Sequence, residues 1–199
     1  MSRVVVKTSA HSEDWLNKAG LLIEALPYMK RYANKPVVVK FGGHAMGEQE
    51  YVESFAADMT LLRQVGAEPI IVHGGGPQIG DMLSRLQIKS NFVNGLRVTD
   101  AATISVVEMV LAGGINKALV AAIHSAGGRA VGLSGKDGQL ITASKLAELS
   151  KPSDSEIERV DLGFVGRPEK VDPTVLHALL GVGMILSLIH ISEPTRLSA

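Results

Sequence analysis

The sequence predicts an α/β fold with a mostly parallel sheet, because one short pattern occurs twice in its first half. Pro36–Phe41 and Glu68–His73 are runs rich in valine and isoleucine, as buried parallel strands are. Each run ends in glycines and is followed by apolar residues at helical spacing, over Glu48–Gly66 and Pro77–Leu86. Strand, turn and helix in repeated order are typical of a sheet covered by helices.

A further helix is predicted ahead of the first strand, over Ser12–Tyr32. Ser12 can cap its N-terminus, and apolar residues from Trp15 to Leu26 fall on one face. Pro27 predicts a kink or a break within it. Two alternatives stay open: the apolar face packs on its own domain, or the helix is an arm that joins subunits.

The middle of the chain is predicted to contain a long apolar helical stretch. Asp100 can cap this stretch, which runs over Ala101–Ala126, and Gly113-Gly114 is expected to divide it into two helices. The polar segment Asn91–Thr99 before it is rich in turn residues. A third strand, Arg129–Leu133, follows and leads into another glycine turn.

The last third is predicted to hold two paired strands and a final helix. Gln139–Ser144 and Gly163–Val171 read as strands that flank a charged insertion, Lys145–Val160. A helix then begins at Asp172-Pro173 and ends near Leu180. The alternation of apolar residues from Ile185 to Ile191 is compatible with one more strand.

The overall composition fits one globular domain and excludes several classes of site. Of the 199 residues 46% are hydrophobic, and 20 basic side chains balance 20 acidic ones, so no net field favours nucleic acid or anionic lipid. There is no cysteine, which excludes disulfides and thiolate metal sites. We find no signal peptide and no apolar stretch approaching the ~20 residues that span a bilayer. These features predict a cytoplasmic protein without a membrane partner.

Glycine turns at three strand ends predict anion binding. They follow Phe41, His73 and Ser134, and in a parallel sheet ligands bind beyond the carboxyl ends of the strands. Glycine permits positive φ and close approach to backbone N–H groups, which hold anionic oxygens at helix N-termini. One such turn is often only a tight turn, but three at equivalent positions favour a site. The usual P-loop and dinucleotide fingerprints are missing, and no metal-ligand spacing occurs.

Several separated motifs resemble the amino-acid kinase superfamily and, within it, the acetylglutamate kinases. Val38–Gly43 and Val72–Ile79 are similar to the two opening signatures of the superfamily. The segments Asn94–Asp100, Leu133–Gly138 and Asp161–Gly166 narrow the resemblance to the acetylglutamate kinases. The resemblance implies a three-layer α/β/α sandwich. It also implies transfer of the γ-phosphoryl group of ATP, with Mg²⁺, to the side-chain carboxylate of N-acetyl-L-glutamate in arginine biosynthesis.

The resemblance assigns roles to six residues. Lys40 is expected to contact the transferring phosphoryl group, and a solvated surface charge is the alternative for it. Arg97 is expected to bind the α-carboxylate of the substrate, unless it forms a surface ion pair near Asp100. The backbone groups that complete the site are those of Gly42 and Gly43 for the ATP phosphates, and of Gly75 and Gly76 for acetylglutamate.

Two other functions remain open at this point, and the resemblance also predicts regulation. Glutamate 5-kinase or aspartokinase activity is one alternative, and a non-catalytic module that only binds substrate is the other. Acetylglutamate kinases inhibited by arginine carry an N-terminal helix that interlaces dimers into a hexamer. The resemblance therefore implies arginine as a feedback inhibitor and a homo-oligomer.

The pattern of motifs divides the chain into three parts. Residues 1–34 are expected to be the N-terminal extension helix, and residues 35–185 an acetylglutamate-binding lobe without its nucleotide lobe. Leu186–Arg196 is identical to one reading frame of a widely used sequencing adapter. Residues 186–199 are therefore expected to be a non-native tail, and the fragment to be inactive although its parent was an enzyme.

Overall fold

The structure is a computed structural model that describes residues 10–43, 45–146, 149–152 and 157–189. The helices are α1 (Ala10–Tyr32), α2 (Gln49–Gln64), α3 (Gly76–Arg85), α4 (Ala101–Glu108), α5 (Asn116–Ser125) and α6 (Thr174–Gly181), with a π-helical turn η2 (Met109–Ile115) and two 3₁₀ turns, η1 (Ala45–Gly47) and η3 (Asp137–Gln139). The strands are β1 (Pro36–Phe41), β2 (Glu68–His73), β3 (Phe92–Val93), β4 (Leu96–Arg97), β5 (Ala130–Leu133), β6 (Ile141–Lys145), β7 (Leu149–Pro152), β8 (Ile157–Val160), β9 (Gly166–Val171) and β10 (Ile185–Ile189).

A four-stranded parallel sheet forms the centre of the fold, in the order β1-β2-β10-β5. The register pairs Phe41 with His73, so the strands β1 and β2 end side by side. The predicted α/β class with a parallel sheet is confirmed, and so are the three strands predicted before residue 134.

Helices cover both faces of this sheet, which confirms the three-layer sandwich. One apolar cluster joins α2 and α5 to the sheet through Ala56, Met59, Leu119, Ile123, Ile71 and Ile185. A second cluster packs Leu180 of α6 against Ile70 and Leu186 on the opposite face. Alternate residues of neighbouring strands supply the two clusters, as expected for a sheet buried on both sides.

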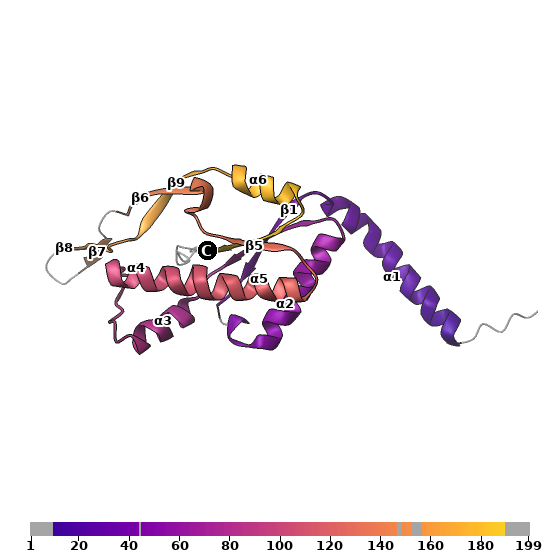
Figure 1. The fold of residues 1–199 in the computed structure, drawn as a ribbon, viewed down its shortest axis with the longest axis horizontal. Helices are drawn as coiled ribbons and strands as arrows, with labels where there is room; N and C mark the ends of the chain where they lie inside the picture. The colour runs from indigo at the N-terminus through magenta and orange to yellow at the C-terminus, as the bar shows by residue number, and fades with distance from the viewer. Residues whose placement is uncertain (1–9, 44, 147–148, 153–156, 190–199) are drawn as a thin grey trace, which may run out of the picture.

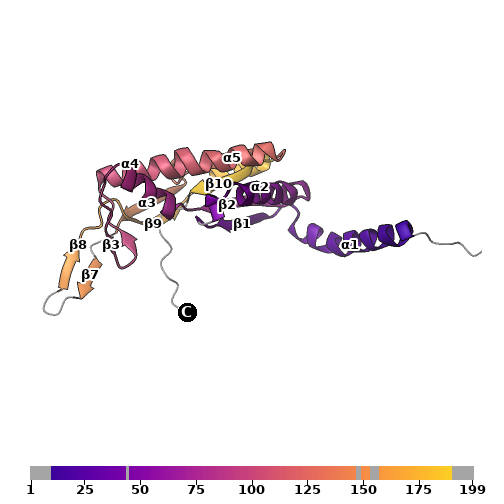
Figure 2. The ribbon, with the colours of Figure 1, turned by 90° about the horizontal axis from the view of Figure 1, so that it is seen from below.

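The long helical stretch is continuous, which corrects the predicted division at Gly113-Gly114. The α4 and α5 helices join through the π-helical turn η2, which contains both glycines (Figures 1 and 2). The Asp100 carboxylate accepts a 2.7 Å hydrogen bond from the Thr103 N–H, so the predicted cap is confirmed. The helix does not end at the glycines, since a π-helical turn, with i→i+5 hydrogen bonds, carries the chain through them.

This continuity also corrects the expectation that no apolar stretch approaches bilayer length. Within the described residues, Ala101–Ser125 spans 25 residues and contains an 18-residue window with a mean hydropathy of 1.7, long and apolar enough to cross a membrane by length and composition alone. Core helices of soluble proteins meet the same criterion. Here Leu119 and Ile123 of this stretch are buried against the sheet.

Asn116, at the start of α5, fixes the long helix to the sheet. Its Nδ2 atom donates to the carbonyl oxygens of Leu133 (3.2 Å) and Ser187 (3.3 Å), on two neighbouring strands. A Cβ at Gly132 would lie 2.4 Å from Asn116 Oδ1, so only glycine leaves room for this side chain. The side chain is buried, which makes the two hydrogen bonds valuable for stability.

The N-terminal helix α1 extends away from the rest of the molecule (Figures 1 and 2). Trp15 is 69% exposed and Leu22 63%, so its apolar side chains do not pack on the chain's own domain. Pro27 lies inside the helix, which continues to Tyr32, so of the predicted kink or break, the break does not occur and the kink stays a prediction. The alternative that the helix packs on its own domain is therefore not supported, and the joining of subunits stays a prediction.

The predicted paired strands in the last third are confirmed. Strands β6 and β9 pair antiparallel, and the insertion between them contains a second antiparallel pair, β7 and β8. The predicted strand after residue 184 is β10, which lies in the middle of the sheet. The expected non-native tail thus supplies Leu186–Ile189 to the sheet, while residues 190–199 lie outside the described residues. Its origin remains a prediction.

Candidate functional site

The glycine turns after β1 and β2 touch each other. A Cβ placed on Gly43 would lie 3.5 Å from the Gly75 Cα atom and 3.3 Å from Pro77. The two turns are neighbours because the parallel strands that precede them end in register. Two of the three turns predicted to bind anions therefore lie side by side at one edge of the sheet.

Gln78, in the first turn of α3, joins the two glycine turns by a hydrogen bond. Its Nε2 donates to the Gly43 carbonyl oxygen at 2.9 Å, across 35 residues of sequence. Its Oε1 atom is buried and has no partner among the described residues. Gln78 lies within the signature Val72–Ile79, but no role was predicted for it, because the sequence does not indicate that its side chain reaches a turn 35 residues away.

Helix α3 starts directly at the second turn. Its first residue is Gly76, Pro77 follows, and the Ile79 N–H is the first to donate back, to the Gly75 carbonyl at 2.9 Å. The N–H groups before Ile79 have no acceptor within the helix, which is the usual state of a helix N-terminus. Together with the helix dipole they favour an anion at this point.

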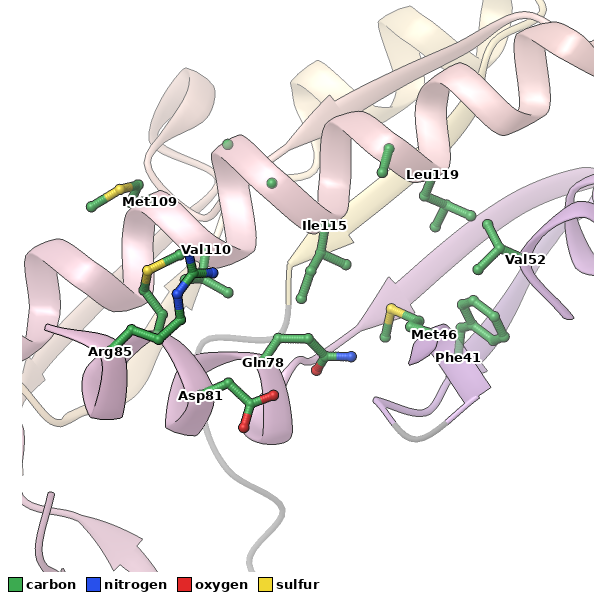
Figure 3. A pocket seen from close by; sticks show the side chains of 14 residues that line it. Phe41, Met46, Val52, Gln78, Asp81, Arg85, Met109, Val110, Ile115 and Leu119 are labelled. Carbon is green, nitrogen blue, oxygen red and sulfur yellow. The ribbon is translucent and has the colours of Figure 1, made fainter. Parts of the chain in front are cut away.

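The long helix presses on the second turn from one side. A Cβ on Gly75 would lie 2.3 Å from Ile115 Cδ1 and 2.8 Å from Leu111 Cδ2. Beside this contact lies a mainly apolar pocket of about 620 Å³ between α3, η2 and the end of β1 (Figure 3). Gln78 and Ile115 both line it, so the pocket borders the glycine turns.

His73 is fully buried immediately before the second turn. Burial lowers the pKa of the imidazole, and the hydrogen bond to the Gly74 carbonyl offsets only part of that shift. Its Nδ1 lies 3.2 Å from the Gly74 oxygen, which can only accept, so Nδ1 carries the hydrogen. A neutral His73 is thus a structural support for the turn.

Lys40 lies near the end of β1, one residue before the buried Phe41, and its side chain is exposed. Phe41 points into the core, where its ring stacks on Phe55 with centroids 4.0 Å apart. Because side chains alternate along a strand, Lys40 points to the opposite face. Its Cα pairs with that of Val72, which places the lysine beside both glycine turns at the same sheet edge.

Arg97 lies in the short hairpin β3–β4 rather than at the sheet edge. It is only 8% exposed, and its guanidinium carbon lies 4.5 Å from the centre of the Phe92 ring. Its Nη1 atom donates a hydrogen bond to the Ser90 hydroxyl. Arg97 is therefore held in a fixed orientation within the hairpin.

The third glycine turn, after β5, is separated from β2 by β10. Asp137 stabilises this turn, because its Oδ2 accepts from the Ser134 N–H at 2.7 Å and from its hydroxyl at 2.9 Å. Lys136 forms an exposed 2.7 Å ion pair with Glu108. Asp137 thus forms its hydrogen bonds within the turn itself. The three turns predicted at equivalent positions share one edge of the sheet, but the third is set apart from the other two by β10.

Comparison with known proteins identifies the fold. Residues 35–190 match the sequence model described as "Amino acid kinase family". The chain belongs to the amino acid kinase family. It is 62% identical over 165 residues to the acetylglutamate kinase of Rhodospirillum rubrum, covering 82% of this chain and 53% of that protein. It is 54% identical over 176 residues to the acetylglutamate kinase of Gluconobacter oxydans, covering 88% of this chain and 60% of that one.

Solved structures agree with the family assignment. The protein smu.665 from Streptococcus mutans superimposes with a TM-score of 0.64 at 25% identity, over 77% of this chain and 58% of that one. N-acetylglutamate synthase from Neisseria gonorrhoeae superimposes with a TM-score of 0.67 at 23% identity, over 86% of this chain and 37% of that one. The second likeness shows the fold alone. The chain spans about half the length of the curated relatives it matches.

The structure thus brings five of the six predicted residues to one edge of the sheet and places Arg97 in the hairpin that follows α3. The individual roles of Lys40, Gly42, Gly43, Gly75, Gly76 and Arg97 stay predictions. Within the described residues, no three histidine, aspartate or glutamate side chains gather closely enough to hold a metal ion.

Proposed function

We propose that this chain is the acetylglutamate-binding part of a kinase that phosphorylates the side-chain carboxylate of N-acetyl-L-glutamate with MgATP. The observation that carries the proposal is the contact between the two glycine turns, with Lys40 at the same sheet edge. The identity of 54 to 62% with proteins named acetylglutamate kinase supports this substrate over glutamate or aspartate. Because those proteins are nearly twice as long as the matched region, the activity belongs to the longer protein.

The chemistry asks for positioning more than for acid–base groups. A glutamate-type carboxylate has a pKa of about 4.3, so the nucleophile is already ionised at neutral pH. Two anions must then be held together while charge develops between them. Gly42 and Gly43 are suited to bind the phosphates through backbone N–H groups. Gly75 and Gly76, at the N-terminus of α3, are suited to bind the acceptor, and Lys40 to neutralise the transferring group.

Arg97 has the geometry expected of a carboxylate-binding residue. Its guanidinium carbon lies over the Phe92 ring, 4.5 Å from the ring centre, and its Nη1 donates to the Ser90 hydroxyl, so these two contacts orient the group. A planar guanidinium whose edge is oriented can bind a carboxylate through two parallel hydrogen bonds. We assign this residue to the α-carboxylate of acetylglutamate.

Mg²⁺ enters this proposal with the nucleotide. In phosphoryl transfer the metal ion bridges phosphate oxygens and neutralises their charge, so a kinase does not need a complete metal cage of its own. The sequence expectation of no dedicated metal site agrees with this chemistry. A cytoplasmic setting, where MgATP is abundant, remains part of the proposal.

The arm α1 is assigned to assembly and regulation of the longer protein. Its exposed apolar residues, such as Trp15 and Leu22, are the kind that pack against a second subunit. We infer that the arm joins subunits into a hexamer and takes part in inhibition by arginine. Removing residues 1–34 from the longer protein should reduce its mass in multi-angle light scattering and weaken that inhibition. Unchanged hexamers would refute the assignment.

The decisive test is phosphoryl transfer. We would assay this chain beside a chimera in which its residues 35–185 replace the matching part of the Rhodospirillum rubrum relative. Coupled detection of ADP with acetylglutamate, glutamate or aspartate should show turnover of the chimera with acetylglutamate. A preference for glutamate would favour a glutamate 5-kinase instead. Calorimetry on the 199-residue chain separates a substrate-binding module from a chain that does not bind acetylglutamate.

A further inference from the structure

We propose that Gln78 is a positioning residue that ties the phosphate-side turn, Gly42-Gly43, to the acceptor-side turn, Gly74–Gly76. This inference rests on the proposed function, because it gives the two turns their two ligands. It adds a residue to the site, one that acts through the turns and touches neither reacting group.

The geometry of the Gln78 side chain is that of a cross-link. Its backbone belongs to the first turn of α3, directly after Gly76 and Pro77. Its side chain reaches the Gly43 carbonyl, 2.9 Å from Nε2. The ladder between β1 and β2 has ended by then, since its last pair is Phe41 with His73. Gln78 therefore continues the connection between the two segments beyond the last strand pair.

The second polar atom of the Gln78 amide, Oε1, lies close to both Gly43 and Gly75. A Cβ on either Gly43 or Gly75 would come within 3.6 Å of Gln78 Oε1. This oxygen is buried without a partner among the described residues. A buried acceptor that makes no hydrogen bond is unfavourable for stability, so packing alone would favour an apolar side chain here. The hydrogen bond that Nε2 donates to Gly43 is the contact that only the amide can make here.

Such a cross-link matters because phosphoryl transfer depends on the separation of donor and acceptor. A misplacement of about 1 Å can reduce the rate about 100-fold without abolishing binding. Gly43 sits on the side assigned to ATP, and Gly75 on the side assigned to acetylglutamate. If Gln78 fixes their spacing, its loss should lower kcat more than it changes either KM.

The first test uses the 199-residue chain and nuclear magnetic resonance. Gln78→Met keeps the size of the side chain and removes the donor, whereas Gln78→Glu keeps the shape but presents an acceptor to the Gly43 carbonyl. Gln64→Met, at an exposed position near the end of α2, is the matched control. The ¹³C carbonyl shift of Gly43 should move in both Gln78 variants and stay unchanged in the control. An unmoved Gly43 shift in Gln78→Met would overturn the cross-link.

Adding N-acetyl-L-glutamate then tests the coupling between the turns. In the unsubstituted 199-residue chain the amide signals of Gly75 and Gly76 should shift on addition of acetylglutamate, and those of Gly42 and Gly43 should shift as well. In Gln78→Met the response at Gly75 and Gly76 should remain and the response at Gly43 should be lost. If Gly75 and Gly76 are silent in the parent, the proposed function fails, and the carbonyl shift still decides the cross-link. If the Gly43 signal shifts as much in Gln78→Met as in the unsubstituted chain, Gln78 does not couple the two turns.

The second test uses kinetics of the active chimera. We expect Gln78→Met to reduce kcat about 10-fold to 100-fold while KM for acetylglutamate and for ATP changes less than about 3-fold. Gln64→Met should match the parent. A rise in KM at constant kcat would show that Gln78 contributes to binding instead, and parent-like kinetics of both Gln78 variants would remove any role in positioning.

Discussion

Replacing Gly163 by alanine tests how the Arg97 hairpin is held in place. Gly163 pairs with Thr99 in an isolated bridge between two segments that are separate in sequence. The Thr99 N–H donates to the Leu162 carbonyl oxygen at 2.9 Å, and the Phe164 N–H donates to the Thr99 carbonyl oxygen at 2.7 Å. The hairpin that carries Arg97 is thus anchored to the chain just before β9 by this bridge.

The structure allows the cost of Gly163→Ala to be worked out in two parts. Gly163 has φ of +73°, where an alanine is disfavoured by about 1 to 2 kcal/mol. The new Cβ would also lie 2.2 Å from the Thr99 carbonyl oxygen, a backbone atom. Relieving that clash separates the two segments and loses two hydrogen bonds of about 1 kcal/mol each. We therefore expect a total loss of about 3 to 4 kcal/mol in the free energy of unfolding.

Gly95→Ala is the matched control for this substitution. Gly95 also has positive φ, +81°, but a Cβ there would meet nothing within 4 Å. It should cost only the conformational part, about 1 to 2 kcal/mol. Urea unfolding followed by circular dichroism at 25 °C measures both. If Gly163→Ala costs no more than Gly95→Ala, the clash with Thr99 has no energetic effect and the anchoring of the hairpin is refuted.

Three further substitutions probe the site and its supports. Lys40→Met should lower kcat of the chimera at least about 100-fold without changing its unfolding midpoint, since the side chain is exposed and its proposed role is charge stabilisation. Arg97→Lys should raise KM for acetylglutamate about 10-fold, because lysine has neither the planar fork nor the stack on Phe92. Asp100→Asn should make the free energy of unfolding fall less steeply with decreasing pH than it does in the unsubstituted chain. The Thr103 N–H holds the pKa of the Asp100 carboxyl below its ordinary value, so its stabilising effect is present above about pH 4 and is lost as the pH falls through the folded-state pKa. Urea midpoints between pH 7 and pH 3 measure this, and identical slopes for parent and variant would contradict it.

The sequence was sufficient for the elements whose signal is local. Strands β1 and β2 were predicted at the bounds the structure shows, because valine-rich runs that end in glycine have few other conformations available. The Asp100 cap was predictable for the same reason, since it depends on residues three positions apart.

The predictions that failed did so where tertiary packing outweighs a local breaker. Gly113-Gly114 lie within a helix that is fixed to the sheet on its C-terminal side by Asn116, and a π-helical turn absorbs them. At Pro27 the break, one of the two outcomes predicted there, does not occur, and the helix continues to Tyr32. Glycine and proline indicate where a helix is weakened, while its end is decided by what surrounds it.

The contacts that complete the site were beyond sequence reasoning because they join irregular segments far apart in the chain. Gln78 reaches Gly43, and Gly163 bridges to Thr99, without any periodicity that would indicate either contact. The sequence pattern predicts which segments form strands. Whether the turns beyond two strands touch depends on the register of those strands, and the structure shows that β1 and β2 end together.

The structure also decides between the two reasons for glycine at the ligand turns. From the sequence alone, either positive φ or close approach of another group can be the reason for glycine at these positions. Gly42, Gly43 and Gly75 all lie outside the positive-φ region, and Gly75 has an extended φ of 175°. Gly43 and Gly75 are instead crowded by Pro77 and by Ile115, while a Cβ on Gly42 would meet nothing within 4 Å. Two glycines are thus needed to pack the turns together. At Gly42 neither positive φ nor contact with the described residues requires glycine, and its role in binding a phosphate stays a prediction.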